Sequence, residues 1–80
     1  MILKEFLEVC SVETPIMLLD ITSGQMQIIA RGLLHYVEID LKANNEQVLF
    51  MDVVFVRYEW GTVKIELRKG NWKIGTRDER

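Results

Sequence analysis

Cysteine and histidine are side chains that often catalyse reactions or bind metals, and this sequence holds one of each, Cys10 and His35. Together they could form a nucleophile and its general base, or supply two ligands to a metal ion. A metal site needs three or four ligands, and the required spacing is absent. Cys10 also falls on an apolar stripe, where cysteine behaves as a small hydrophobic residue. The sequence therefore predicts no metal, no cofactor and no thiol chemistry.

Carboxylates are the other candidates for catalysis, since a pair of them can act as general acid and base. Asp20, Asp40 and Asp52 lie at predicted strand or turn positions, where solvated charge is ordinary. The sequence contains neither G-x-x-x-x-G-K-[ST] nor G-x-G-x-x-G, the glycine-rich motifs that bind phosphates. We expect no catalytic residues, and hence a protein that is not an enzyme.

The basic residues gather at the C-terminal end. Residues 1–63 carry four basic and nine acidic side chains, a net charge of −5, and residues 64–80 carry six basic and three acidic ones, a net charge of +3. Trp72 and Lys73 lie in this basic segment, and a stacking ring within a basic stripe is a way to bind single-stranded nucleic acid. The three acids in the same segment weaken that interpretation. We favour a polar tail over residues 71–80, and the acidic body argues against nucleic acid as a partner.

A set of apolar and aromatic residues forms the next candidate binding surface. Its members alternate along one predicted strand and are Val54, Val56, Tyr58 and Trp60. If their side of the strand were open, they would form an apolar patch on a small domain, which usually marks an interface. The alternative is that the N-terminal helix covers them. We favour this cover and keep the open patch as the candidate binding site.

The elements that must position these residues begin with an amphipathic helix over residues 2–10, which should end before Pro15. Strands are predicted at 16–22 and 25–31, joined as a hairpin through a Ser-Gly turn. In the second of them, Met26, Ile28 and Ala30 are expected to share one face. Residues 46–51 fit either one helical turn or the start of a long strand.

Residues 33–43 admit two interpretations. As a strand, Val37, Ile39 and Leu41 point inward; as a helix, one side is lined by Leu33, Leu34, Val37 and Leu41. The strict alternation favours the strand.

The stretch from Asp52 to Lys69 predicts a second hairpin. The uninterrupted apolar run Val53–Val56 predicts cover on both faces, which places the hairpin in the middle of the fold. A two-residue turn at Trp60-Gly61 would force a positive φ on a bulky residue. A three-residue loop, Glu59 to Gly61, with only the glycine left-handed is therefore favoured. It pairs Val53 with Leu67, and Phe55 with Ile65.

Eighty residues, 49% of them hydrophobic, predict one small domain over residues 1–70 with a thin core. We expect an α+β fold, an N-terminal helix packed on an antiparallel sheet of four or five strands. The alternative is a small SH3- or Sm-like barrel with one N-terminal helix. One thiol and no long apolar segment predict a cytoplasmic protein, with Met1 as its native start and no membrane contact.

Two stretches, LKEFLEVC near the start and DVVFVRYEWGTVKIEL at residues 52–67, carry a resemblance. The chain resembles small uncharacterised proteins encoded by phages and prophages of Gram-positive bacteria, which begin with a similar helix and end in a V-V-x-V…V-x-I-x-L hairpin. The likeness covers both ends of residues 3–69, and the middle, residues 31–51, departs from it. The resemblance implies an α+β fold and a phage-borne accessory role, and it brings no catalytic residues.

Size, charge and this resemblance favour a non-enzymatic protein that acts by protein–protein binding. By analogy, it would inhibit a host defence protein in the host cytoplasm, as an anti-CRISPR does, since an acidic body can mimic nucleic acid. A thin core also favours a homo-oligomer. The alternative is a small nucleic-acid- or nucleotide-binding module that uses the basic C-terminal end. The candidate binding residues are Val54, Val56, Tyr58, Trp60, Trp72 and Lys73.

Overall fold

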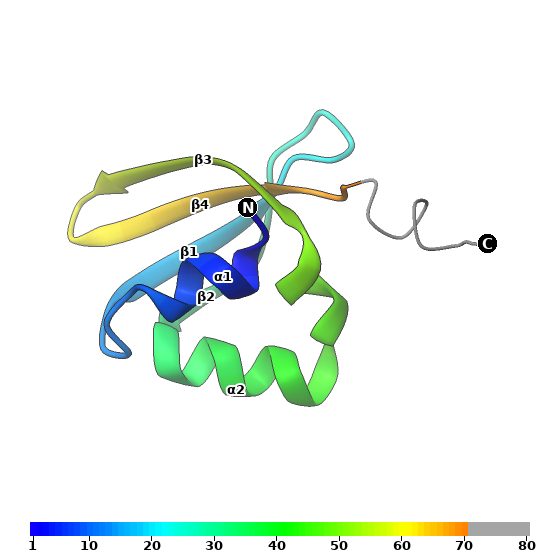
Figure 1. Cartoon of the computed structure of the whole chain (residues 1–80). Helices are drawn as coiled ribbons and strands as arrows, with labels where there is room; N and C mark the ends of the chain where they lie inside the picture. Colours follow the sequence, from blue (N-terminus) through cyan, green and yellow to red (C-terminus); the bar gives the residue numbers. More distant parts are fainter. Residues whose placement is uncertain (71–80) are drawn as a thin grey trace.

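The computed structural model describes residues 1–70 of the chain. The tail predicted at 71–80, with Trp72 and Lys73, lies outside the described residues. The described part contains a sheet with helices packed on one of its sides (Figure 1). The predicted α+β class is confirmed, and the N-terminal helix has a second helix beside it.

Four strands form one sheet in the order β2-β1-β4-β3. They are β1 (Pro15–Asp20), β2 (Gln27–Leu33), β3 (Asp52–Glu59) and β4 (Thr62–Arg68). The two predicted hairpins are both present and antiparallel, but β1 and β4, which join them, run parallel. The expectation of a purely antiparallel sheet is therefore wrong, because a helical connection between the hairpins allows a parallel pairing. The sheet is open rather than a closed barrel, and β3 lies at its edge instead of in the middle.

The N-terminal helix α1 (Leu3–Glu8) forms where the sequence predicts it. Leu3 and Leu7, one turn apart, are buried, and the charged positions between them face solvent. The N–H of Ile2 donates to the Glu5 carboxylate at 3.1 Å, which satisfies one of the free amides at the helix start. A helix of six residues depends on such packing, since isolated short helices are not stable in water.

The second helix, α2 (Leu34–Asn44), replaces the strand that was favoured for residues 33–43. Leu34, Val37 and Leu41 are buried against the sheet, whereas Ile39 is 53% exposed. The strand prediction is wrong because positions four apart share a side in a strand and in a helix alike. The burial of Leu34 and the exposure of Ile39 separate the two.

A 3₁₀ helix, η1 (Glu46–Phe50), connects α2 to β3, as one of the two interpretations of residues 46–51 predicted. Within residues 1–70, α1, α2 and η1 lie on the same side of the sheet (Figure 1). The core between the two layers consists of Leu3, Leu7, Ile16, Leu18, Leu34, Val37, Leu41, Val48, Leu49, Met51, Ile65 and Leu67. The opposite side of the sheet carries no helix within residues 1–70.

A bulge in β2 changes the predicted faces of that strand. Ala30 pairs with Leu18 and Ile28 pairs with Leu19, so Ile29 is an extra residue between them. Ile28 and Ala30 were expected to share a face and instead lie on opposite faces. One inserted residue reverses the alternation from that point onward.

A second bulge has the same effect in β3. Val53 pairs with Leu67 as predicted, but Phe55 pairs with Glu66, and Val56 takes the predicted place opposite Ile65. The apolar run from Val53 to Val56 therefore reflects a bulge in an edge strand, and not a strand covered on both faces.

Candidate functional site

Strand β3 and the turn after it carry a run of exposed apolar side chains, in which Phe55 lies on the face opposite to that of Val56 and Tyr58. We call this group the hairpin surface; its members Val54, Phe55, Val56, Tyr58 and Trp60 are 42, 52, 37, 71 and 96% exposed. All except Phe55 were candidates from the sequence. The tip of the β3–β4 hairpin extends past the helices (Figure 1). The favoured expectation that the N-terminal helix covers this surface is therefore wrong.

From Val56 towards the turn, the boundary of the helix layer runs between β4 and β3. Val56 and Ile65 face each other across these strands on the helix side, yet Ile65 is fully buried while Val56 is exposed. In the next pair towards the turn, Val63 is partly buried and Tyr58 is exposed. The apolar side chains of β3 thus extend the apolar face of the sheet beyond the part that the helices cover.

The outer edge of β3 is occupied only at its beginning. Ile2 pairs with Asp52, and the N–H of Val53 donates to the carbonyl oxygen of Met1 at 2.8 Å. From Val54 to Glu59, no strand among residues 1–70 pairs with this edge. An unpaired edge with apolar side chains is a template on which a strand of another chain can pair. Natural proteins usually protect such an edge or use it to bind a partner.

The turn of the hairpin holds Trp60 in a left-handed conformation. Glu59 pairs with Thr62, so the turn has two residues, Trp60 with φ 54° and Gly61 with φ 75°. The three-residue loop favoured from the sequence is wrong. Two positive φ values are those of a type I′ turn, whose twist matches that of the flanking strands. The left-handed conformation costs about 1–2 kcal/mol for a residue with a Cβ.

Charged side chains lie on the other face of the hairpin. Lys64 Nζ contacts Glu59 Oε1 at 2.8 Å, and this hydrogen bond, with the nearby charges of Lys64 and Arg57, holds the pKa of Glu59 below its ordinary value. Arg57 lies 3.8 Å from Glu66 and 4.0 Å from Glu59. Its Nε atom is enclosed and has no hydrogen-bond acceptor among residues 1–70. These pairs are partly exposed, so they contribute little to stability.

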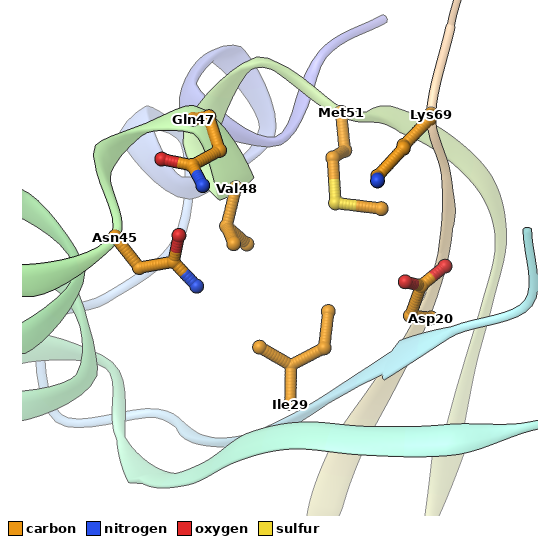
Figure 2. A pocket seen from close by; sticks show the side chains of 7 residues that line it. All are labelled: Asp20, Ile29, Asn45, Gln47, Val48, Met51 and Lys69. Atoms are coloured by element: carbon orange, nitrogen blue, oxygen red, sulfur yellow. The ribbon is translucent and has the colours of Figure 1, made fainter.

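A separate pocket of about 390 Å³ lies between the end of β1 and η1 (Figure 2). Its lining combines apolar and polar side chains, which are Asp20, Ile29, Asn45, Gln47, Val48, Met51 and Lys69. Hydrogen bonds from Thr22 lower the pKa of the Asp20 carboxyl, and Lys69 lowers it further. One carboxylate and one ammonium give the pocket no preference for phosphate.

Cys10 and His35 each contact a side chain or backbone group close to them in the sequence. The Cys10 thiol donates to the carbonyl oxygen of Phe6 at 3.5 Å, and burial raises its pKa, which makes it less reactive. The His35 ring packs against Tyr36, with 5.5 Å between the ring centres. Within the described residues, no three His, Cys, Asp or Glu side chains lie close enough to hold a metal ion.

The basic residues from position 64 to 70 do not form one cluster, because some lie in the hairpin and one lines the pocket. Lys64 is bonded to Glu59 and Lys69 lines the pocket, while Arg68 is exposed at the end of β4. Trp72 and Lys73 lie outside the described residues. The structure therefore brings together four of the six candidate binding residues.

Two members of this region were missed by the sequence, Phe55 and Arg57. Phe55 was assigned to the buried face because its expected partner was Ile65. The four-residue apolar run was the available signal, since a bulge breaks alternation just as double-sided cover does.

Comparison of the chain with protein-family models, with curated proteins and with solved structures gives no match. Within residues 1–70, no helix combines the length and the apolar character that crossing a membrane would require.

Proposed function

We propose that this protein is a non-enzymatic binding protein that contacts a protein partner through the hairpin surface. The single observation that carries the proposal is Trp60, which is 96% exposed and held at a positive φ. Strained backbone conformations cluster at binding sites, where they present a side chain. A solvated indole at a strained position contributes nothing to this fold that a smaller residue would not.

The chemistry of the neighbouring residues supports the same proposal. Trp, Tyr and Arg are the residues that most often dominate the energy of protein interfaces, and all three occur at the turn end of β3. Tyr58 and Arg57 lie on opposite faces of the strand, and Trp60 begins the turn. The free edge from Val54 onward can add main-chain hydrogen bonds to a partner. An inhibitory role against a host defence protein stays a prediction that rests on the resemblance to phage proteins.

The nucleic-acid alternative draws less support. Its stacking ring and one of its lysines lie outside the described residues, and Lys64 is engaged by Glu59. The pocket beside Lys69 also contains the Asp20 carboxylate, which repels phosphate.

A photoreactive benzoylphenylalanine at position 60 tests the proposal in the cells that make the protein. The matched control carries the same group at Tyr36, which is 67% exposed on α2. We expect protein adducts from position 60 that are absent from position 36. They should disappear when Tyr58→Ala is added. The proposal fails if position 60 gives no adduct, or if both positions capture the same proteins equally.

A further inference from the structure

The hairpin turn determines which backbone groups of β3 face outward. In a two-residue hairpin the residues that flank the turn form a hydrogen-bonded pair, so Glu59 bonds to β4 and the pattern then alternates. The N–H and C=O groups of Tyr58 and Val56 therefore point away from β4. Val53 confirms this orientation, because its N–H donates to Met1 on the outer side.

A second copy of the chain can pair with this edge through a two-fold axis. Antiparallel pairing of β3 with itself allows axes at Val56, Arg57 or Tyr58 that keep the faces aligned. An axis at Val56 would bring Glu59 of one copy opposite Val53 of the other. That position is already taken by the N-terminal residue, so this arrangement is excluded.

Charge separates the two remaining arrangements. An axis at Arg57 places Arg57 opposite Arg57 of the second copy, and like charges directly opposite are destabilising. An axis at Tyr58 places Arg57 opposite Glu59 of the second copy, and the symmetry makes this pair twice. Among residues 1–70, no carboxylate lies closer than 3.8 Å to the Arg57 side chain, so a carboxylate of the second copy would complete its contacts.

The same axis joins the apolar side chains on the helix side of the strand. Tyr58 meets Tyr58 of the second copy, and Val56 meets Trp60 of the second copy on both sides of the axis. These side chains are 71, 37 and 96% exposed in one chain, and pairing removes them from water together. The turn of the second copy extends along β3 only as far as Phe55. It therefore does not meet Met1 and Ile2, which pair with the start of β3.

We propose, on the basis of the proposed function, that the partner of the hairpin surface is a second copy of this chain. The two β3 strands pair antiparallel about Tyr58, with Arg57 opposite Glu59 and Val56 opposite Trp60. The result is a continuous eight-stranded sheet, made from two sheets of four strands.

Engineered disulfides test the register. With Cys10 replaced by Ala, Tyr58→Cys places two thiols across the axis, where the Cα atoms of an opposed pair lie about 5.5 Å apart, within disulfide range. Val56→Cys is the matched control, since its two copies would lie about 13 Å apart along the strands. Under mild oxidation we expect a covalent dimer from Tyr58→Cys and a monomer from Val56→Cys. A dimer from Val56→Cys, or none from Tyr58→Cys, overturns this arrangement.

Charge reversal and sedimentation test the partner. We expect wild-type protein to sediment at twice the mass of the chain at micromolar concentration. Arg57→Glu or Glu59→Arg alone should weaken the dimer about tenfold or more, and the double exchange should largely restore it. If the wild-type protein is a monomer at every concentration, the inference that its partner is a second copy is wrong. If position 60 still captures another protein, the proposed function stands and only this inference fails.

Discussion

Two parts of the same sheet have similar apolar sequences and opposite surroundings. In β4, Ile65 and Leu67 lie beneath the helices and are fully buried. In β3, Val56 and Tyr58 occupy neighbouring positions on the same side and are 37 and 71% exposed. The difference shows that alternation identifies the face of a strand but not what covers it. An apolar face that the chain leaves uncovered is available to a partner.

The largest expected effect contrasts two residues that face each other. Ile65→Ala should lower the free energy of unfolding by about 2–5 kcal/mol, because it opens a cavity in the core. Val56→Ala, in the monomer, should cost less than about 1 kcal/mol. Denaturant unfolding at a concentration where the chain is monomeric measures both. Equal losses would mean that the helices also cover β3.

The next effect concerns the turn that presents the hairpin surface. Gly61→Val should lower the free energy of unfolding by about 1–2 kcal/mol, because a β-branched residue resists the φ of 75°. Gly61→Asn is the matched control, since asparagine tolerates this conformation. We expect a smaller loss from it in the same thermal melts. No difference between the two variants would place the turn elsewhere.

Trp60→Asn should change stability and binding in opposite directions. Asn-Gly is the preferred sequence for this turn, so the unfolding free energy of the monomer should rise by up to about 1 kcal/mol. Sedimentation should show that the dimer is lost, because the indole is gone. If the variant is less stable, or if it dimerises as well as wild type, then Trp60 has a structural role.

The smallest effect is a pH dependence of the free energy of unfolding that arises from Asp20, the last residue of β1. The pKa of Asp20 is lowered on folding from its ordinary value of 3.8 by hydrogen bonds from Thr22. Its stabilisation is therefore complete above the unfolded pKa and is lost as the pH falls through the lower, folded pKa. Unfolding measured between neutral pH and pH 2 should lose a small increment that Asp20→Asn no longer shows. An identical pH profile for the variant would contradict this role.

The sequence by itself determined the elements whose periodicity has one interpretation. The apolar spacing of Leu3 and Leu7 specifies α1, and the alternation of Val63, Ile65 and Leu67 specifies β4. It also identified Val54, Val56, Tyr58 and Trp60 as a group, though not as an exposed one. Periodicity is a local property, so it survives in any tertiary arrangement that buries one face.

Tertiary structure decided between alternatives that the local sequence pattern fits equally well. Val37 and Leu41 fit a strand and a helix alike, and α2 forms because its apolar stripe packs onto the sheet. The turn at Trp60 takes two residues because the twist of the paired strands outweighs the local preference of a bulky side chain. Bulges, the parallel pairing of β1 with β4 and the exposure of β3 likewise depend on which strand or helix lies alongside. A single segment carries no record of its neighbours, so these features are fixed only when the whole chain packs.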